Sequence, residues 1–213
     1  INKDFATFGL GSARVGIGFD FPLSYDSGLL AYSKNTSRGF LTGFTIGGGA
    51  GAPISIKISG CECSNVYNGI ILASTTNKVV VEGCYIEGGD GGIGIQNLGS
   101  YNTIENNLIY PGFLTGIQDT STTNIGSVIE KNVVSLGAVV NAIGIDVKSD
   151  AAFGGNGKVV TNNTLVYTAG TAGVIGIKQS GTDPRLNCLG NGFNPRAAWT
   201  GAGSIKISDL TPF

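Results

Sequence analysis

Apolar and polar residues alternate along most of the chain in runs of only three to five residues, as in residues 78–82 (KVVVE). A period of two is the pattern of a short β-strand with one buried face. No stretch of ten or more residues repeats its apolar positions every 3.6 residues, as an amphipathic helix would. The pattern therefore predicts an all-β protein built from many short strands.

These strands recur as an internal repeat. Residues 58–72 align without a gap with residues 81–95, so that Gly60 matches Gly83 and Cys61 matches Cys84. Looser copies begin at Leu41, Ile104, Ile129 and Val160, and a degenerate copy lies at residues 188–193. In the last three of these looser copies, a Gly-Ile phrase follows 12 to 15 residues after the first residue. A unit of about 23 residues, made of short strands and variable loops, is typical of a solenoid coil.

A two-residue turn sits at the same place in each copy. Its first residue, such as Asn106 or Asn162, is of a type that tolerates the left-handed backbone conformation. The second residue should face inward, where its amide can bond the next coil and build a ladder. This inward position holds Asn107, Asn132 and Asn163, and in the two preceding copies Cys61 and Cys84.

The two cysteines leave three interpretations open. Buried thiols can replace Asn as small inward side chains, which is the interpretation we favour. Because stacked strands lie about 4.8 Å apart, a Cys61–Cys84 disulfide is also geometrically possible. Metal or redox chemistry is the third alternative.

The repeat resembles the right-handed parallel β-helix family of pectate lyase-like proteins, which includes bacteriophage tailspikes and polysaccharide lyases. The resemblance covers roughly residues 38–186 and rests on VEGCYIEG, TIENNLIY, VIEKNVVSL and VVTNNTLVY, each followed by its Gly-Ile strand. It implies a right-handed parallel β-helix of about seven to eight coils. Residues 1–37 would form irregular first coils, residues 38–186 the core, and residues 187–213 a terminal coil and cap. In that family the outer face of the first strand of a coil, here the Gly-Ile strand, usually forms the substrate groove.

A polar stripe is predicted on this strand. The inward residues would be Ile93, Ile95, Ile117, Ile143, Ile145, Ile175 and Ile177. The outward residues would then include Gln96, Gln118, Asp146 and Lys178, which we call the polar stripe, and Lys148 beside it. Outward glycines at Gly94, Gly144 and Gly176 would let a ligand approach the backbone. Such a row suits an extended polysaccharide; the alternative is a solvated sheet face without function.

Cleavage of a glycan would need two carboxyl groups. Asp146 is the best candidate, with Asp119 on the preceding coil or Asp90 in a Gly-rich loop as its partner. Asp119 could instead turn inward to cap a loop, and Asp90 could be a turn residue. The arginines lie outside the Gly-Ile strands and histidine is absent, so the motifs of pectate lyases and polygalacturonases are missing. The sequence leaves open whether the protein is a glycoside hydrolase, a polysaccharide lyase or a binding module.

A second stripe consists of Glu82, Glu105 and Glu130. Three stacked carboxylates repel one another, but Lys57, Lys78 and Lys131 are close enough in sequence to relieve this. A Ca²⁺ or Mg²⁺ site is one interpretation. We prefer a solvated ladder that discourages edge pairing, and expect no cofactor.

The end of the chain offers one aromatic candidate. Trp199, with Arg196 nearby, could be a sugar platform that contributes to substrate binding. The alternative, which we prefer, is a plug over the open end of the solenoid.

Composition narrows the partners. Glycine supplies 36 of 213 residues and charged residues 13%, while 41% are hydrophobic, which argues against disorder. A net charge of −1 gives no electrostatic footprint for nucleic acid, and no apolar run is long enough to cross a membrane. With no methionine and no signal-peptide pattern, we expect a piece of a longer chain. The resemblance to tailspikes implies a homotrimer, outside the cell or on a virion surface.

Overall fold

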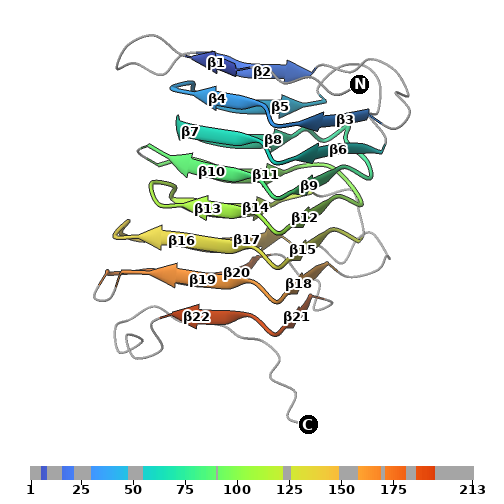
Figure 1. The fold of residues 1–213 in the computed structure, drawn as a ribbon. Helices are drawn as coiled ribbons and strands as arrows, with labels where there is room; N and C mark the ends of the chain where they lie inside the picture. Colours follow the sequence, from blue (N-terminus) through green and yellow to red (C-terminus); the bar gives the residue numbers. More distant parts are fainter. Residues whose placement is uncertain are drawn as a thin grey trace.

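The computed structural model describes residues 6–8, 16–21, 30–47, 55–89, 91–121, 126–148, 158–168, 171–180 and 186–194. In these residues the regular structure consists of strands in three parallel sheets, and no helix is present (Figure 1). Accordingly, no described helix is long and apolar enough to cross a membrane.

Each sheet takes every third strand. Sheet A contains β1 (Ala6–Phe8), β4 (Thr36–Arg38), β7 (Glu62–Val66), β10 (Tyr85–Gly88), β13 (Leu108–Tyr110), β16 (Val133–Gly137), β19 (Thr164–Tyr167) and β22 (Gly192–Asn194). Sheet B contains β2 (Ile17–Phe21), β5 (Thr42–Ile46), β8 (Asn68–Leu72), β11 (Ile93–Asn97), β14 (Thr115–Asp119), β17 (Ile143–Lys148) and β20 (Ile175–Ser180). Sheet C contains β3 (Leu30–Ser33), β6 (Ile56–Ser59), β9 (Val80–Glu82), β12 (Thr103–Glu105), β15 (Val128–Glu130), β18 (Val159–Thr161) and β21 (Asn187–Leu189).

The chain winds through the sheets in a fixed cyclic order, from C to A to B and on to the next coil (Figure 1). Every strand therefore pairs in parallel with the strand one coil before or after it, as β11 does with β8 and β14. This arrangement is a parallel β-helix, and it confirms the fold predicted from the repeat. The stack extends beyond residues 38–186 on both sides, because β1 to β4 and β21 and β22 belong to the same sheets.

The inner faces of the three sheets share one apolar core. In sheet B, Ile70, Ile95, Ile117 and Ile145 lie at one register on consecutive strands, and each is fully buried. Burying a side chain of this size contributes about 1.5–3 kcal/mol, so each coil is stabilised by packing on its neighbours. The repeat of apolar residues in the sequence thus becomes a column of side chains in space.

The turn between sheets C and A carries the expected ladder. Its first residue is left-handed in every described coil, with φ between 55° and 67°, at Lys34, Gly60, Gly83, Asn106, Lys131, Asn162 and Gly190. The second residue faces inward, and Asn132 Nδ2 donates to Asn163 Oδ1 at 2.9 Å, while Asn107 Nδ2 donates to Asn132 Oδ1 at 3.0 Å. Asn35 and Asn191 extend the ladder at its two ends, and Asn191 lies in the degenerate copy predicted at residues 188–193.

Cys61 and Cys84 are free, each 1% exposed, so the structure matches the interpretation as small buried side chains. The backbone amide of Cys84 donates to Asn107 Oδ1 at 2.9 Å, which joins the cysteine coils to the Asn ladder. A hydrogen bond with Cys61, together with burial, raises the pKa of Cys84 far above its ordinary value.

The glycine of the Gly-Ile phrase faces the interior, which corrects the predicted orientation of Gly94, Gly144 and Gly176. A Cβ on Gly94 would lie 2.5 Å from the carbonyl oxygen of Gly116 and 2.9 Å from Ile109 Cγ2. Both Gly94 and the next residue, Ile95, are buried, so the alternation of inward and outward residues is interrupted. Consequently Ile93, Ile143 and Ile175, which were predicted to face inward, are partly exposed.

Candidate functional site

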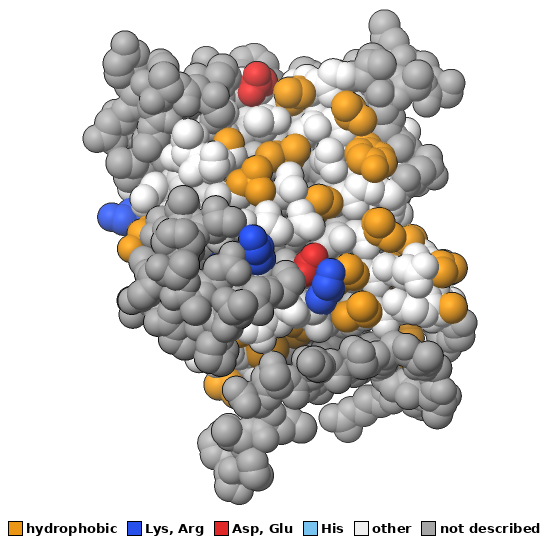
Figure 2. Space-filling view, turned by 180° about the vertical axis from the view of Figure 1, so that it is seen from behind, with side chains coloured by type: hydrophobic (Ala, Val, Ile, Leu, Met, Phe, Trp, Pro, Cys, Tyr) orange, Lys and Arg blue, Asp and Glu red, His pale blue; other side chains and the backbone are white. Residues whose placement is uncertain are grey.

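The outer face of sheet B holds the polar stripe in a single register. Gln96 pairs with Gln118, Gln118 with Asp146, and Asp146 with Lys178 on successive strands. Figure 2 shows this side of the molecule, where a few charged side chains lie on a surface of hydrophobic and uncharged polar groups. Lys148 lies two residues beyond Asp146 at the end of β17. The residues predicted for the stripe are therefore neighbours in space.

Two contacts order the stripe. Gln96 Nε2 donates to Gln118 Oε1 at 2.9 Å, which links two strands through their side-chain amides. Lys178 Nζ lies 3.8 Å from Asp146 Oδ2. Asp146 itself is only 8% exposed, and no described group donates a hydrogen bond to its Oδ1. A buried carboxylate oxygen without a donor carries a desolvation cost that a donor on a bound ligand would offset.

Asp119 does not join Asp146, which corrects its proposed role as a catalytic partner. It is fully buried on the inner face of sheet B, because it is one residue beyond the outward Gln118. Its Oδ1 lies 2.7 Å from Lys158 Nζ and accepts a hydrogen bond from Ser121 Oγ at 2.9 Å. The structure thus shows the alternative in which Asp119 turns inward and caps a loop.

Two other candidates, Asp90 and Trp199, lie outside the described residues. The acidic stripe is described in full, and Glu82, Glu105 and Glu130 do stack in one register. Lys57 Nζ lies 2.6 Å from Glu82 Oε1, and Lys131 Nζ lies 3.2 Å from Glu130 Oε1. Within the described parts of the chain, no three Cys, Asp or Glu side chains converge as metal ligands would.

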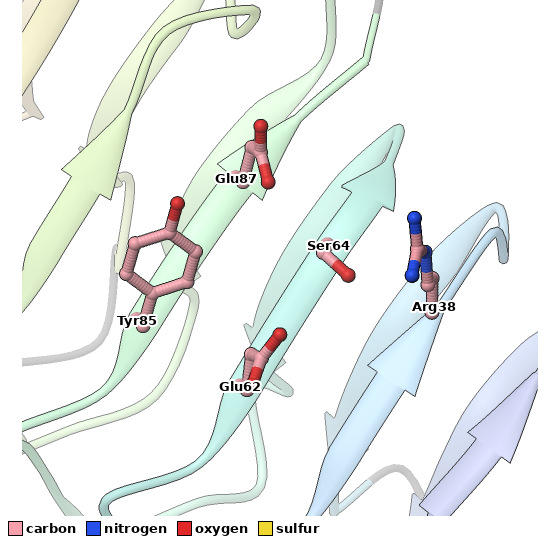
Figure 3. Close-up of a pocket in the computed structure, with 5 residues that line it drawn as sticks. All are labelled: Arg38, Glu62, Ser64, Tyr85 and Glu87. Atoms are coloured by element: carbon pink, nitrogen blue, oxygen red, sulfur yellow. The ribbon is translucent and has the colours of Figure 1, made fainter.

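A hollow on the outer face of sheet A escaped the sequence reasoning. It has a volume of about 370 Å³ and is lined by Arg38, Glu62, Ser64, Tyr85 and Glu87, which we call the tyrosine hollow (Figure 3). These residues come from β4, β7 and β10, and a register shift between β7 and β10 lies opposite Glu87. Bulges of this kind re-aim side chains and are common beside functional sites.

A family model described as a right handed beta helix region matches residues 24–189, which is more than half of the chain. The chain belongs to the right-handed β-helix family. No curated protein and no solved structure matches this β-helix. Because family membership gives the fold rather than the activity, the function has to be argued from the surfaces.

The outer faces of this β-helix differ in chemistry. Sheet B presents amides with one carboxylate and its lysine, whereas sheet C presents glutamates, two of which pair with lysine. Sheet A presents tyrosine and glutamate. A signal for the outer face of sheet A was present in the sequence, since Glu62, Tyr85 and Glu87 all follow the two-residue turn by one to three residues. It was missed because the groove was sought only on the Gly-Ile strands.

Proposed function

We propose that this β-helix binds a polysaccharide along the outer face of sheet B, over the polar stripe. The observation that supports this most is Asp146 Oδ1, a buried acceptor without a donor, set in a row of hydrogen-bonding side chains. Four strands about 4.8 Å apart give a row roughly 14 Å long. An extended glycan offers hydroxyl groups along a comparable length, so each strand can contact it.

The proposal is binding without cleavage. Among the described outward residues of sheet B, the other carboxylate is Asp20, five strand steps from Asp146 in the sheet order. Five steps of about 4.8 Å give roughly 24 Å, whereas glycoside hydrolysis uses carboxyl groups about 5–9.5 Å apart. With this ligand class we also propose a homotrimer located outside the cell or on a virion surface, to which the low charge of the face is suited.

The test is retention on immobilised bacterial surface polysaccharides, followed by affinity measurement for those that bind. Asp146→Ala removes the carboxylate and Gln118→Ala removes the neighbouring amide, while Glu105→Gln on sheet C is the matched control. Losing a hydrogen bond to a buried charged group costs about 1.5–3 kcal/mol, so Asp146→Ala should weaken binding about tenfold or more. The control should bind as the unmodified protein does.

Three results would contradict the proposal. If Asp146→Ala and Gln118→Ala bind with unchanged affinity, the stripe is not the site. If no polysaccharide is retained, the β-helix is better explained as a structural shaft. Oligosaccharides released from a bound polymer would instead show that the protein cleaves, and binding alone would be the wrong description.

A further inference from the structure

The tyrosine hollow lies on sheet A, away from the polar stripe on sheet B, and it brings three charged side chains together. Glu62 and Arg38 are exposed and Glu87 is partly exposed. In Figure 3, Glu62 and Ser64 stand on β7, Tyr85 and Glu87 on β10, and Arg38 on β4. The register places Tyr85 opposite Glu62 and Arg38 opposite Ser64.

No cation among the described residues neutralises the carboxylates of the hollow. Glu82 and Glu130 on sheet C each have a lysine within 3.2 Å. By contrast, no described residue forms an ion pair with Glu62, Glu87 or Arg38 within 4.0 Å. Two like charges on adjacent strands repel each other, and a cation between them would relieve this. The hollow as a whole carries two negative charges and one positive charge.

Aromatic rings continue the hollow along the stack. The rings of Tyr85 and Tyr110 lie 5.2 Å apart and are tilted by 38°, and Tyr110 is 42% exposed. Burial and then the carboxylates of Glu87 and Glu62, with Tyr110, raise the pKa of Tyr85. An ammonium group beside these glutamates would also be attracted by the face of the ring.

We propose that the tyrosine hollow binds a cationic amino sugar of a glycan chain, with the ammonium group between Glu62 and Glu87 and the sugar ring on Tyr85 and Tyr110. A sugar polymer fits better than a lysine side chain, because the two rings lie on consecutive strands and form a platform that extends along the stack. Ser64 and Arg38 supply a hydroxyl and a guanidinium at the other side of the hollow for the hydroxyl groups of the sugar.

The experiment compares two probes with the same backbone, an oligomer of β-1,4-linked glucosamine and its fully N-acetylated counterpart. Affinity is measured by calorimetry at about pH 5.5, where the amines of the glucosamine oligomer are protonated. The glucosamine oligomer should bind, and rising salt should weaken it. The acetylated oligomer, which lacks the charges, should bind at least tenfold more weakly.

The variants Glu62→Gln and Glu87→Gln keep the shape of the side chain and remove its charge. Since the hollow is open to solvent, each should weaken binding of the glucosamine oligomer about threefold, and the double variant about tenfold. Glu105→Gln on sheet C should have no effect. Asp146→Ala should leave this binding intact, which separates it from the polysaccharide binding proposed for sheet B.

Two outcomes would overturn this inference. The first is binding that does not depend on charge. It would be seen as equal affinity for the charged and acetylated oligomers, or as unchanged affinity in a double variant whose melting temperature equals that of the unmodified protein. The second is tighter binding of an oligolysine peptide of equal charge, since the occupant would then be a cationic protein segment rather than a sugar.

Discussion

At the scale of single residues, the interior side of sheet B has room for a hydrogen atom at Gly94 and nothing larger. The nearest groups are the backbone carbonyl of Gly116 and the side chain of Ile109, which comes from sheet A. The carbonyl belongs to the ladder of the next strand and cannot move without breaking it. One glycine in each coil is therefore needed for two sheets to meet at this corner.

This predicts that Gly94→Ala destabilises the protein. Overpacking of a close-packed interior typically costs about 1–3 kcal/mol, and we expect about 2–3 kcal/mol here because the obstructing atom is backbone. The free energy of unfolding in urea measures the change. Gly192→Ala is the control, since no atom lies within 4 Å of its added Cβ, and it should alter stability by less than about 0.5 kcal/mol. A loss of less than about 0.5 kcal/mol in Gly94→Ala would mean that the backbone at this corner can shift to accommodate a methyl group.

At the scale of an element, the turn between sheets C and A is held by side-chain amides. Asn132 donates to the carbonyl of Ile104 at 3.0 Å and to Asn163 Oδ1, and its own Oδ1 accepts from the backbone and side chain of Asn107. Each ladder residue thereby satisfies groups on the coil before it and the coil after it. Cys61 and Cys84 fill the same position with fewer hydrogen bonds.

We predict that Asn132→Ala lowers the free energy of unfolding by about 2–4 kcal/mol, because it leaves several buried polar groups without partners. Asn132→Cys should lose less, since this chain already uses cysteine at the equivalent position in two coils. Asn162→Gly is the control, because its left-handed φ of 57° suits glycine and should leave stability nearly unchanged. Denaturant unfolding of the three variants ranks their free energies of unfolding. A lower stability of Asn132→Cys than of Asn132→Ala would contradict the argument.

The turn was predictable from the sequence because its requirements are local. A residue that tolerates a left-handed φ must come first and a small or amide side chain second, and both recur at a visible spacing. The inward placement of Gly94 was not predictable, because it depends on Ile109 filling the space from another sheet. Likewise Glu62 and Glu87 alternate with apolar residues as on any solvated strand, and only the register between β7 and β10 brings them to one hollow.

At the scale of the whole molecule, the apolar interior of the β-helix is separate from its three outer faces. The stacked interior holds the coils together, while each outer face is free to carry its own chemistry. The described interior also includes an ion pair between Asp119 at the end of β14 and Lys158 before β18, with the side chains 0% and 7% exposed. It joins residues 39 positions apart and so ties different coils together.

This pair yields the prediction that separates a structural Asp119 from a catalytic one. Removing one partner, as in Asp119→Leu or Lys158→Met, leaves a buried charge uncompensated and should cost about 3–5 kcal/mol. The double variant Asp119→Leu/Lys158→Met removes both charges and should recover most of that loss, because an apolar pair of similar volume is often neutral. Denaturant unfolding measures this cycle, and polysaccharide binding of the folded double variant should match that of the unmodified protein. If the double variant loses as much free energy of unfolding as the two single variants together, the two side chains act independently. If a stable double variant no longer binds polysaccharide, Asp119 belongs to the functional site after all.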